Sequence, residues 1–198
     1  MHLLESFAVL FGIACVVLTV RQNIWCWPTG LVQVVLYVYI FHEARLYSDM
    51  ILHVIYVGLQ IYGWYYWVRK GRQIGERLPV TRLAPSHMSA FATGTFAVAW
   101  VWGEVMAGYT DAALPYLDAF IAVASLTAQF LMARKKLESW IVWIIVDVTA
   151  IYVFWSRDLM MTAGLYAVFL GLCIAGLTEW RKSFQARAAS ASVEATAA

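Results

Sequence analysis

The sequence predicts an all-α membrane protein with seven transmembrane helices, because apolar segments of membrane-spanning length follow one another along most of it. Of the 198 residues, 63% are hydrophobic and 13% are charged, and the mean hydropathy is +0.70. A soluble domain carries roughly 25% charged residues, about twice this fraction. Each segment can cross a hydrocarbon core of about 30 Å, since a helix rises about 1.5 Å per residue.

The predicted spans, in order, are 3–20, 24–41, 47–68, 88–109, 115–133, 138–155 and 159–180. The first segment lacks the basic start of a cleaved signal peptide and contains Glu5, so we expect it to remain as a helix. The connection at 69–87 is the longest and holds two of the four prolines, which indicates a solvated cytoplasmic linker. The tail at 181–198 ends in an Ala/Ser-rich stretch that we expect to be frayed and cytoplasmic.

The distribution of basic residues predicts the orientation of these helices. If the segments outside the spans are taken alternately, one set holds 12 of the 14 Lys and Arg residues and the other holds 2. Because basic loops stay in the cytoplasm, the N-terminus is expected outside and the C-terminus inside. Six or eight spans would destroy this alternation.

An internal repeat is indicated when the chain is aligned with itself at an offset of 113 residues. The rare residues that coincide are the pairs Trp27/Trp140, Trp67/Trp180, Gly58/Gly171 and Gly63/Gly176. This predicts a 3+1+3 arrangement, with 1–68 and 115–180 as parallel three-helix repeats and 88–109 as a linker helix. Parallel repeats of this kind are known in transporters. Chance matching within an apolar composition is the alternative.

Polar residues recur on one face of the third predicted helix. Asp49, His53, Tyr56 and Gln60 stand at helical spacing, and Gln60 is expected roughly 17 Å below Asp49 at about 1.5 Å per residue. Side chains on the other helices form similar faces. These are Trp140, Trp143 and Asp147 on the sixth span, Asp118, Ser125 and Gln129 on the fifth, and Gln33 on the second.

Four of these side chains, Gln33, Gln60, Ser125 and Asp147, are expected near the midplane of the bilayer, each on a different helix. Polar groups at this depth must be paired or must face a wet cavity, so a shared cavity is predicted. Interhelical hydrogen bonds are the alternative for the amides, for Ser125 and for His53. An aromatic belt at the membrane surface is the alternative for Trp140.

Asp147 carries the most information, because no Lys or Arg lies within the interior of any predicted span. Its carboxyl group must be protonated, solvated, or balanced by a ligand. An organic cation held between tryptophan faces would satisfy it through ion pairing and cation–π attraction. A protonated aspartic acid bonded between helices remains the structural alternative.

Several other classes of function are disfavoured. The basic residues form short clusters between spans, so no nucleic-acid partner is expected. Cys15, Cys26 and Cys173 have no CxxC spacing and are expected to be core residues rather than metal ligands or disulfides. Asp49 and His53 are the only candidate metal or catalytic pair, and a third ligand is missing. No cofactor, metal or enzymatic activity is therefore expected.

Three segments resemble the PnuC-type vitamin transporter family, and in particular its nicotinamide riboside transporters. They are LYSDMILHVIYVGLQIYGWYYW at 46–67, LDAFIAVASLTAQFLMARK at 117–135, and the pattern W-x-x-W-x-x-x-D at 140–147. The resemblance implies seven helices in a 3+1+3 arrangement, a homotrimer in the bacterial inner membrane, and facilitated diffusion. It also implies trapping of the nucleoside by a cytoplasmic nicotinamide riboside kinase.

By the same resemblance, Trp140 and Trp143 match substrate-binding tryptophans, and His53 and Gln60 occupy positions that often carry amides. Asp147 departs from the asparagine typical of nicotinamide riboside transporters, so thiamine or another cationic vitamin stays open as the substrate. Proton-coupled uptake through Asp147, and a receptor or assembly subunit without a wet cavity, also stay open. The full set of expected substrate-binding residues is Trp140, Trp143, Asp147, Gln60, His53, Tyr56, Gln33, Ser125 and Gln129.

Overall fold

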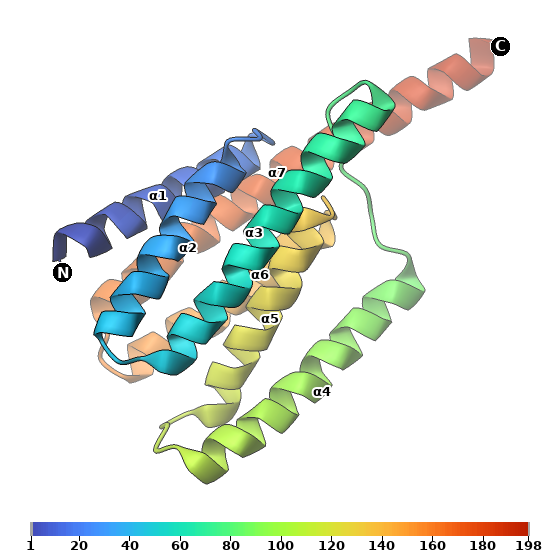
Figure 1. Ribbon diagram of the computed structural model, residues 1–198. Coiled ribbons are helices and arrows are strands. Elements are labelled where there is room, and N and C mark those ends of the chain that lie inside the picture. The colour runs from blue at the N-terminus through green and yellow to red at the C-terminus, as the bar shows by residue number, and fades with distance from the viewer. Residues whose placement is uncertain (1, 198) are drawn as a thin grey trace.

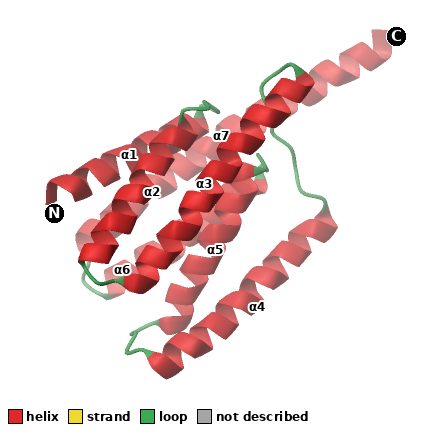
Figure 2. Cartoon of the chain, in the orientation of Figure 1, coloured by secondary structure: helices red, strands yellow, loops and turns green. Residues whose placement is uncertain are grey.

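A computed structural model describes residues 2–197, together with the side chains of all of these except His2, Tyr47, Ser48 and 191–197. Met1 and Ala198, the outer ends of the predicted first repeat and tail, lie outside the described residues. The described chain forms seven helices joined by short loops and one longer linker (Figures 1 and 2). They are α1 (His2–Val20), α2 (Cys26–Glu43), α3 (Tyr47–Ile74), α4 (Pro85–Tyr109), α5 (Pro115–Ala133), α6 (Glu138–Ser156) and α7 (Met160–Ala197).

The prediction of seven helices is confirmed, and local signals explain several of their ends. Pro85 and Pro115 stand in the first turn of α4 and α5, where a missing N–H costs nothing and the fixed φ suits a helix. Gly75 follows α3 with φ +68°, a left-handed conformation that ends a helix at little cost for glycine. Two helices exceed their predicted spans by more than three residues: α3 continues past 68 to Ile74, and α7 continues past 180 to Ala197.

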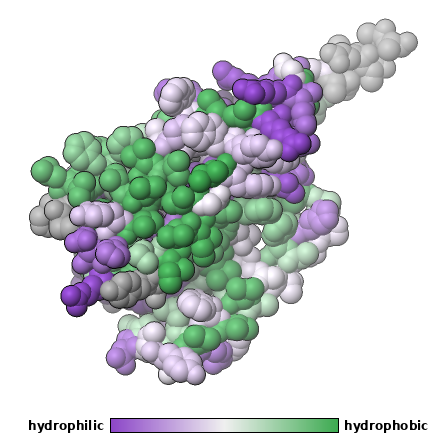
Figure 3. All heavy atoms as spheres, in the orientation of Figure 1, coloured by the Kyte–Doolittle hydropathy of each residue, from purple (hydrophilic) through white to green (hydrophobic). Residues whose placement is uncertain are grey.

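Five of the helices in the described chain are long and apolar enough to cross a membrane: α1, α4, α5, α6 and α7. The remaining two, α2 and α3, hold polar side chains within their length, among them Gln33, His53 and Gln60. Figure 3 shows apolar side chains covering the middle of the visible face, with hydrophilic side chains gathered toward its ends. Of these three side chains, Gln60 is buried in the bundle, and Gln33 and His53 are half-buried.

The helices pack mainly against their sequence neighbours, with two contacts between distant parts of the chain. α2 lies between α1 and α3, and α6 lies between α5 and α7. α3 also packs on α5, and α1 packs on α7, so the two groups meet along two seams. Within the described chain, α4 contacts α5 and no other helix, and Figure 1 shows it at the side of the bundle.

Helix boundaries recur at the offset of 113 residues. That offset carries α1 onto α5, the end of α2 at Glu43 onto the end of α6 at Ser156, and the start of α3 onto the start of α7. The loops recur as well. Gln22 and Lys135 both have φ 53°, and Arg45 and Asp158 have φ 59° and 58°, although a positive φ is uncommon outside glycine.

Four buried tryptophans form an aromatic cluster, which we call the tryptophan cluster: Trp27, Trp67, Trp140 and Trp180. The Trp27 and Trp67 rings meet edge to face at 5.3 Å and 81°, and the Trp140 and Trp180 rings do so at 5.4 Å and 89°. The geometry of the first pair is thus reproduced by the pair 113 positions later.

The tryptophan cluster also joins the two groups of helices. Trp67 donates its indole N–H to the carbonyl of Ala133 at the end of α5, at 3.1 Å. Trp180 donates to the carbonyl of Thr19 at the end of α1, at 3.0 Å. These bonds satisfy carbonyl groups that a helix end leaves without an intrahelical partner. We call this end of the bundle, which includes the α1–α2 and α5–α6 loops and the end of α3, the basic end.

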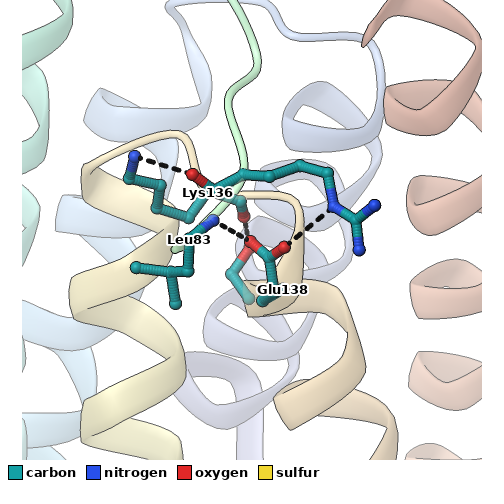
Figure 4. A network of polar contacts seen from close by, with 5 residues as sticks. Leu83, Lys136 and Glu138 are labelled. Carbon is teal, nitrogen blue, oxygen red and sulfur yellow. Dashed lines mark hydrogen bonds and ion pairs between the residues drawn. The ribbon is translucent and has the colours of Figure 1, made fainter. Parts of the chain in front are cut away.

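The α3–α4 linker lies against the α5–α6 loop and the start of α6, although most of its residues are exposed. Thr81 donates its amide to the carbonyl of Lys135 at 3.1 Å and accepts from the amide of Leu137 at 2.9 Å. The buried Glu138 carboxylate accepts from the amide of Leu83 at 3.0 Å and from the Arg82 guanidinium at 3.2 Å (Figure 4). These bonds fix the position of the linker on the bundle.

Candidate functional site

Asp147 lies in the interior of the bundle, on α6, with only 2% of its surface exposed. Its Oδ2 atom has no hydrogen-bond partner among the described residues, and none of the ion pairs found in them involves Asp147. The Cys173 thiol of α7 lies beside it. A buried acid that lacks a cation is costly in a membrane protein, which makes Asp147 a candidate functional residue.

Gln60 is a second buried polar group with an unused acceptor. It is 6% exposed, and its Oε1 atom has no partner among the described residues. Its amide covers Gly30 of α2, where an added Cβ would collide with it and would lie 2.8 Å from the Cys15 sulfur. Gly30 therefore provides the space that brings the Gln60 side chain inward between α1 and α2.

Tyr56 and Ser125 meet across the α3–α5 seam. The Tyr56 hydroxyl donates to the Ser125 Oγ at 2.6 Å, and Ser125 in turn donates to the carbonyl of Ala122 at 2.9 Å. The structure thus brings together two residues that the sequence placed on different helices, 69 positions apart. Both side chains are satisfied by this bond, as expected for polar groups within a membrane.

His53 lies half-buried in an aromatic group on α2 and α3. Its Nδ1 atom is 2.8 Å from the carbonyl oxygen of Asp49, one turn earlier on α3. The rings of Phe41, Tyr37 and Tyr56 lie 4.9, 5.3 and 5.6 Å from its own. This bond lies within α3 and is not an interhelical hydrogen bond, and the second ring nitrogen of His53 remains able to bind a ligand.

The two tryptophans of the sixth helix lie in different surroundings. Trp140 is 1% exposed and packs onto Gly176, where an added Cβ would come within 2.5 Å of its ring. Its Nε1 atom is buried without a partner among the described residues. Trp143, one turn deeper, is half-buried at the margin of the same core. The Trp143 ring is therefore freer to contact a ligand than the enclosed Trp140 ring.

The remaining two predicted residues lie on the first repeat and on α5. Gln33 packs near Gly12 of α1, where an added Cβ would lie 2.8 Å from its amide nitrogen. Gln129 is half-buried on α5. The tight approach at Gly12 and Gly30 shows that glycines on α1 and α2 make room for the amides of Gln33 and Gln60.

The sequence predicted Cys173 as a core residue and did not place it beside Asp147. Cys173 beside Asp147 occupies the position that Gln60 has in the first half, and Trp143 occupies that of Gly30. Asp147 itself corresponds to the buried Val34. The 113-residue offset, which pairs Cys173 with Gln60, was the signal that could have drawn attention to Cys173. The two halves share a backbone pattern but differ in the side chains that they present, so any site between them is asymmetric.

The structure has a cleft of about 530 Å³ at the basic end, away from the predicted midplane residues. None of the nine predicted site residues lines it. Its walls are formed by Gln22, Asn23, Ile24, Trp67, Val68, Gly71, Arg72, Gly75, Glu76, Arg77, Leu78 and Lys135. Within the described chain, no group of three His, Cys, Asp or Glu side chains could hold a metal ion.

Known proteins resemble this chain in sequence and in fold. A family model described as nicotinamide mononucleotide transporter matches residues 2–182. The nicotinamide riboside transporter PnuC of Escherichia coli K12 is 26% identical over 95% of this chain and 89% of its own length. PnuC of Neisseria mucosa is 29% identical, over 90% of this chain and 72% of its own.

A more distant relative has a different named substrate. The riboflavin/roseoflavin transporter RibM of Streptomyces davaonensis is 23% identical over 86% of this chain and 81% of its own length. Among solved structures, a crystal structure of the vitamin B3 transporter PnuC superposes with a TM-score of 0.71 at 27% identity. That match covers 92% of this chain and 82% of the other.

Proposed function

This chain belongs to the nicotinamide mononucleotide transporter family, and from that membership we propose that it takes up nicotinamide riboside by facilitated diffusion across the bacterial inner membrane. Two relatives that match nine tenths or more of the chain are named nicotinamide riboside transporters. The observation that carries the choice of a cationic substrate is the buried carboxyl of Asp147, whose Oδ2 atom has no hydrogen-bond partner among the described residues. Nicotinamide riboside carries a fixed positive charge that would balance it.

The proposed site combines residues from both halves of the bundle. Trp143 would stack on the nicotinamide ring, and Asp147 and Gln60 would bind polar or charged groups of the ligand through their free oxygens. Gln33, His53, Tyr56, Ser125, Gln129 and Trp140 would complete the walls. Cation–π attraction to a desolvated indole contributes about 2 kcal/mol, enough for a clear effect on affinity.

The proposed architecture has two parallel three-helix repeats, α1–α3 and α5–α7, joined by α4. The recurrence of helix ends and of positive φ at an offset of 113 residues supports it. The basic end would face the cytoplasm, with the N-terminus outside, because it gathers the loops that hold most Lys and Arg residues. A homotrimer, and trapping of the nucleoside by a cytoplasmic kinase, belong to the same proposal and rest on the family resemblance.

Calorimetric titration of the purified protein with nicotinamide riboside, thiamine and riboflavin side by side tests the substrate. Binding of nicotinamide riboside alone, or at least tenfold more tightly than the others, is the expected result. Preference for thiamine would favour the second candidate, which the departure from asparagine at Asp147 keeps open. Preference for riboflavin, as the name of RibM would suggest, would contradict the cation argument.

The mode of transport is tested with protein in liposomes. Facilitated diffusion predicts equal uptake with and without a pH gradient. Uptake that collapses when the gradient is removed would instead assign Asp147 to proton coupling. If neither binding nor uptake is found for any of the three vitamins, the transport proposal itself fails.

A further inference from the structure

The cleft at the basic end is separate from the proposed vitamin site and has its own chemistry. It has a volume of about 530 Å³, within the range of sites for ligands of nucleotide size. Its walls come from three parts of the chain: the α1–α2 loop, the end of α3 with the following linker, and Lys135 of the α5–α6 loop. These segments belong to both groups of helices, so the cleft depends on the closed packing at this end.

The charge of the cleft is positive. Arg72, Arg77 and Lys135 line it, and Glu76 is the one acid among its lining residues. The Glu76 carboxylate forms an ion pair at 3.5 Å with Arg187 of α7, which does not line the cleft. The amide side chains of Gln22 and Asn23, which also line the cleft, add neutral donors.

Lys135 is the unusual member of this group, because it is a cation with only 1% of its surface exposed. Its Nζ atom donates to the carbonyl of Leu78 at 2.5 Å and lies 4.5 Å from the Trp67 ring and 5.9 Å from the Trp180 ring. It forms no ion pair with any acid in the described residues. A buried ammonium group without an anion carries a desolvation cost that carbonyl and π contacts offset only in part.

The backbone holds Lys135 in place. Its amide donates to the carbonyl of Met132 at 2.9 Å, and its own carbonyl accepts from Thr81 at 3.1 Å. With φ at 53°, the residue turns sharply at the end of α5 and directs its side chain under the tryptophan cluster. The cation is therefore positioned before any ligand arrives, which lowers the entropy lost on binding.

We propose that this cleft binds the phosphate group of a nucleoside monophosphate, with Lys135, Arg77 and Arg72 as the cationic partners. A phosphate monoester carries about −1.5 to −2 charges and three acceptor oxygens, which suits one buried ammonium and two guanidinium groups. The rest of the cleft volume would hold the nucleoside. The proposal uses the proposed function only in taking the basic end as cytoplasmic, where phosphorylated vitamin would accumulate.

Calorimetric titration of the full-length protein in neutral phosphatidylcholine nanodiscs tests this assignment. The probes are nicotinamide mononucleotide, AMP, inorganic phosphate and nicotinamide riboside. Both monophosphates are expected to bind, at least tenfold more tightly than inorganic phosphate, and to lose affinity as salt is raised. Equal affinity for inorganic phosphate would indicate an unspecific anion contact and would overturn the proposal.

Variants identify the residues. Lys135→Gln is expected to weaken binding of both monophosphates at least tenfold. Because Lys135 is buried and its loss can disturb folding, the exposed pair Arg72→Gln and Arg77→Gln provides a second test with the same expected loss. Lys70→Gln is the matched control, since Lys70 is an exposed cation at the end of α3 that does not line the cleft. Unchanged binding in the double variant would overturn the proposal.

Two further outcomes separate this site from its alternatives. Nanodiscs that contain phosphatidic acid test a lipid headgroup as the source of phosphate, and variant-sensitive binding of phosphatidic acid without any binding of free monophosphates would overturn the nucleotide assignment. If the riboside binds and the monophosphates do not, the phosphate site is ruled out and the transport proposal stands. If the monophosphates bind in a variant-sensitive way and the riboside does not, the phosphate site stands and the transport proposal fails.

Discussion

The indole ring of Trp140 occupies the space that a side chain at Gly176 would need, with the nearest ring atom 2.5 Å from an added Cβ. The same relationship exists 113 positions earlier, where Trp27 covers Gly63. Each glycine lets a tryptophan from the preceding helix pack against backbone, and each tryptophan then meets a second one, Trp67 or Trp180, edge to face. The tryptophan cluster thus depends on two glycines.

Alanine at these glycines is therefore expected to destabilise the protein. Gly63→Ala and Gly176→Ala each force a buried indole to move, and overpacking of this kind costs about 1–3 kcal/mol. Thermal unfolding in detergent should show a lowered midpoint for both. Gly58→Ala and Gly171→Ala are matched controls, because they form the other repeat-related glycine pair and an added Cβ there meets nothing within 4 Å. Equal midpoints for all four variants would contradict the packing account.

Trp143→Ala is expected to weaken binding of nicotinamide riboside by at least about tenfold, the equivalent of about 1.4 kcal/mol, with expression unchanged. The reason is the loss of an indole face beside the proposed cation, since Trp143 is half-buried and not enclosed as Trp140 is. Calorimetry on the purified variant provides the measurement. Trp155→Ala, on the same helix but 64% exposed, should leave affinity unchanged. Unchanged affinity in Trp143→Ala would remove this residue from the site.

Asp147→Asn is expected to retain uptake of nicotinamide riboside, with affinity lowered by less than about tenfold. Asparagine keeps the shape and one acceptor, and the tryptophan faces still attract the cation. Asp147→Val, which removes every polar atom, should abolish uptake. Both variants are measured in liposomes with labelled riboside. Complete loss in Asp147→Asn would show that the charge or a titrating proton is indispensable.

Lys135 should make stability depend on pH in the alkaline range. The pKa of Lys135 is lowered from 10.5 to about 8, mainly by burial, which Cys26 opposes and the Arg77 guanidinium reinforces. Because the folded protein disfavours the protonated form, the buried charge lowers the free energy of unfolding. This destabilisation is complete below about pH 8 and disappears as pH rises toward 10.5.

The measurement compares wild type with Lys135→Met at a series of pH values. The unfolding midpoint of wild type should rise relative to the variant between pH 8 and 10, because only wild type loses the buried charge there. Lys70→Met, at an exposed position, should follow wild type. Parallel curves for wild type and Lys135→Met would show that the ammonium group is not held in an unfavourable environment.

The prediction of the protein family is confirmed by a family model over residues 2–182. The helix predictions succeeded because apolar length and flanking charge are local properties, which the chain carries wherever it packs. The linker at 69–87 shows what such local properties cannot predict. Most of its residues are exposed, but Thr81 pairs with the α5–α6 loop and Leu83 with Glu138 of α6, and nothing local in the sequence indicates partners more than 50 positions away.

Helical spacing placed Trp140, Trp143 and Asp147 on one face, but it could not predict how deeply each side chain is buried. The structure encloses Trp140 against Gly176 of α7 and leaves Trp143 half-buried. Lys135 is a second example. A lysine in a short basic loop is expected to be exposed, but Lys135 is buried against the rings of two tryptophans.

The number of helices, the 113-residue offset and the polar face of each helix could be predicted from the sequence, because these follow from the order and spacing of residues along one chain. The polar atoms that lack partners, the enclosed tryptophans and the cleft at the basic end are visible only in the folded protein. Those features depend on the approach of distant helices to within a few ångströms, and such distances are set by the packing of both surfaces together.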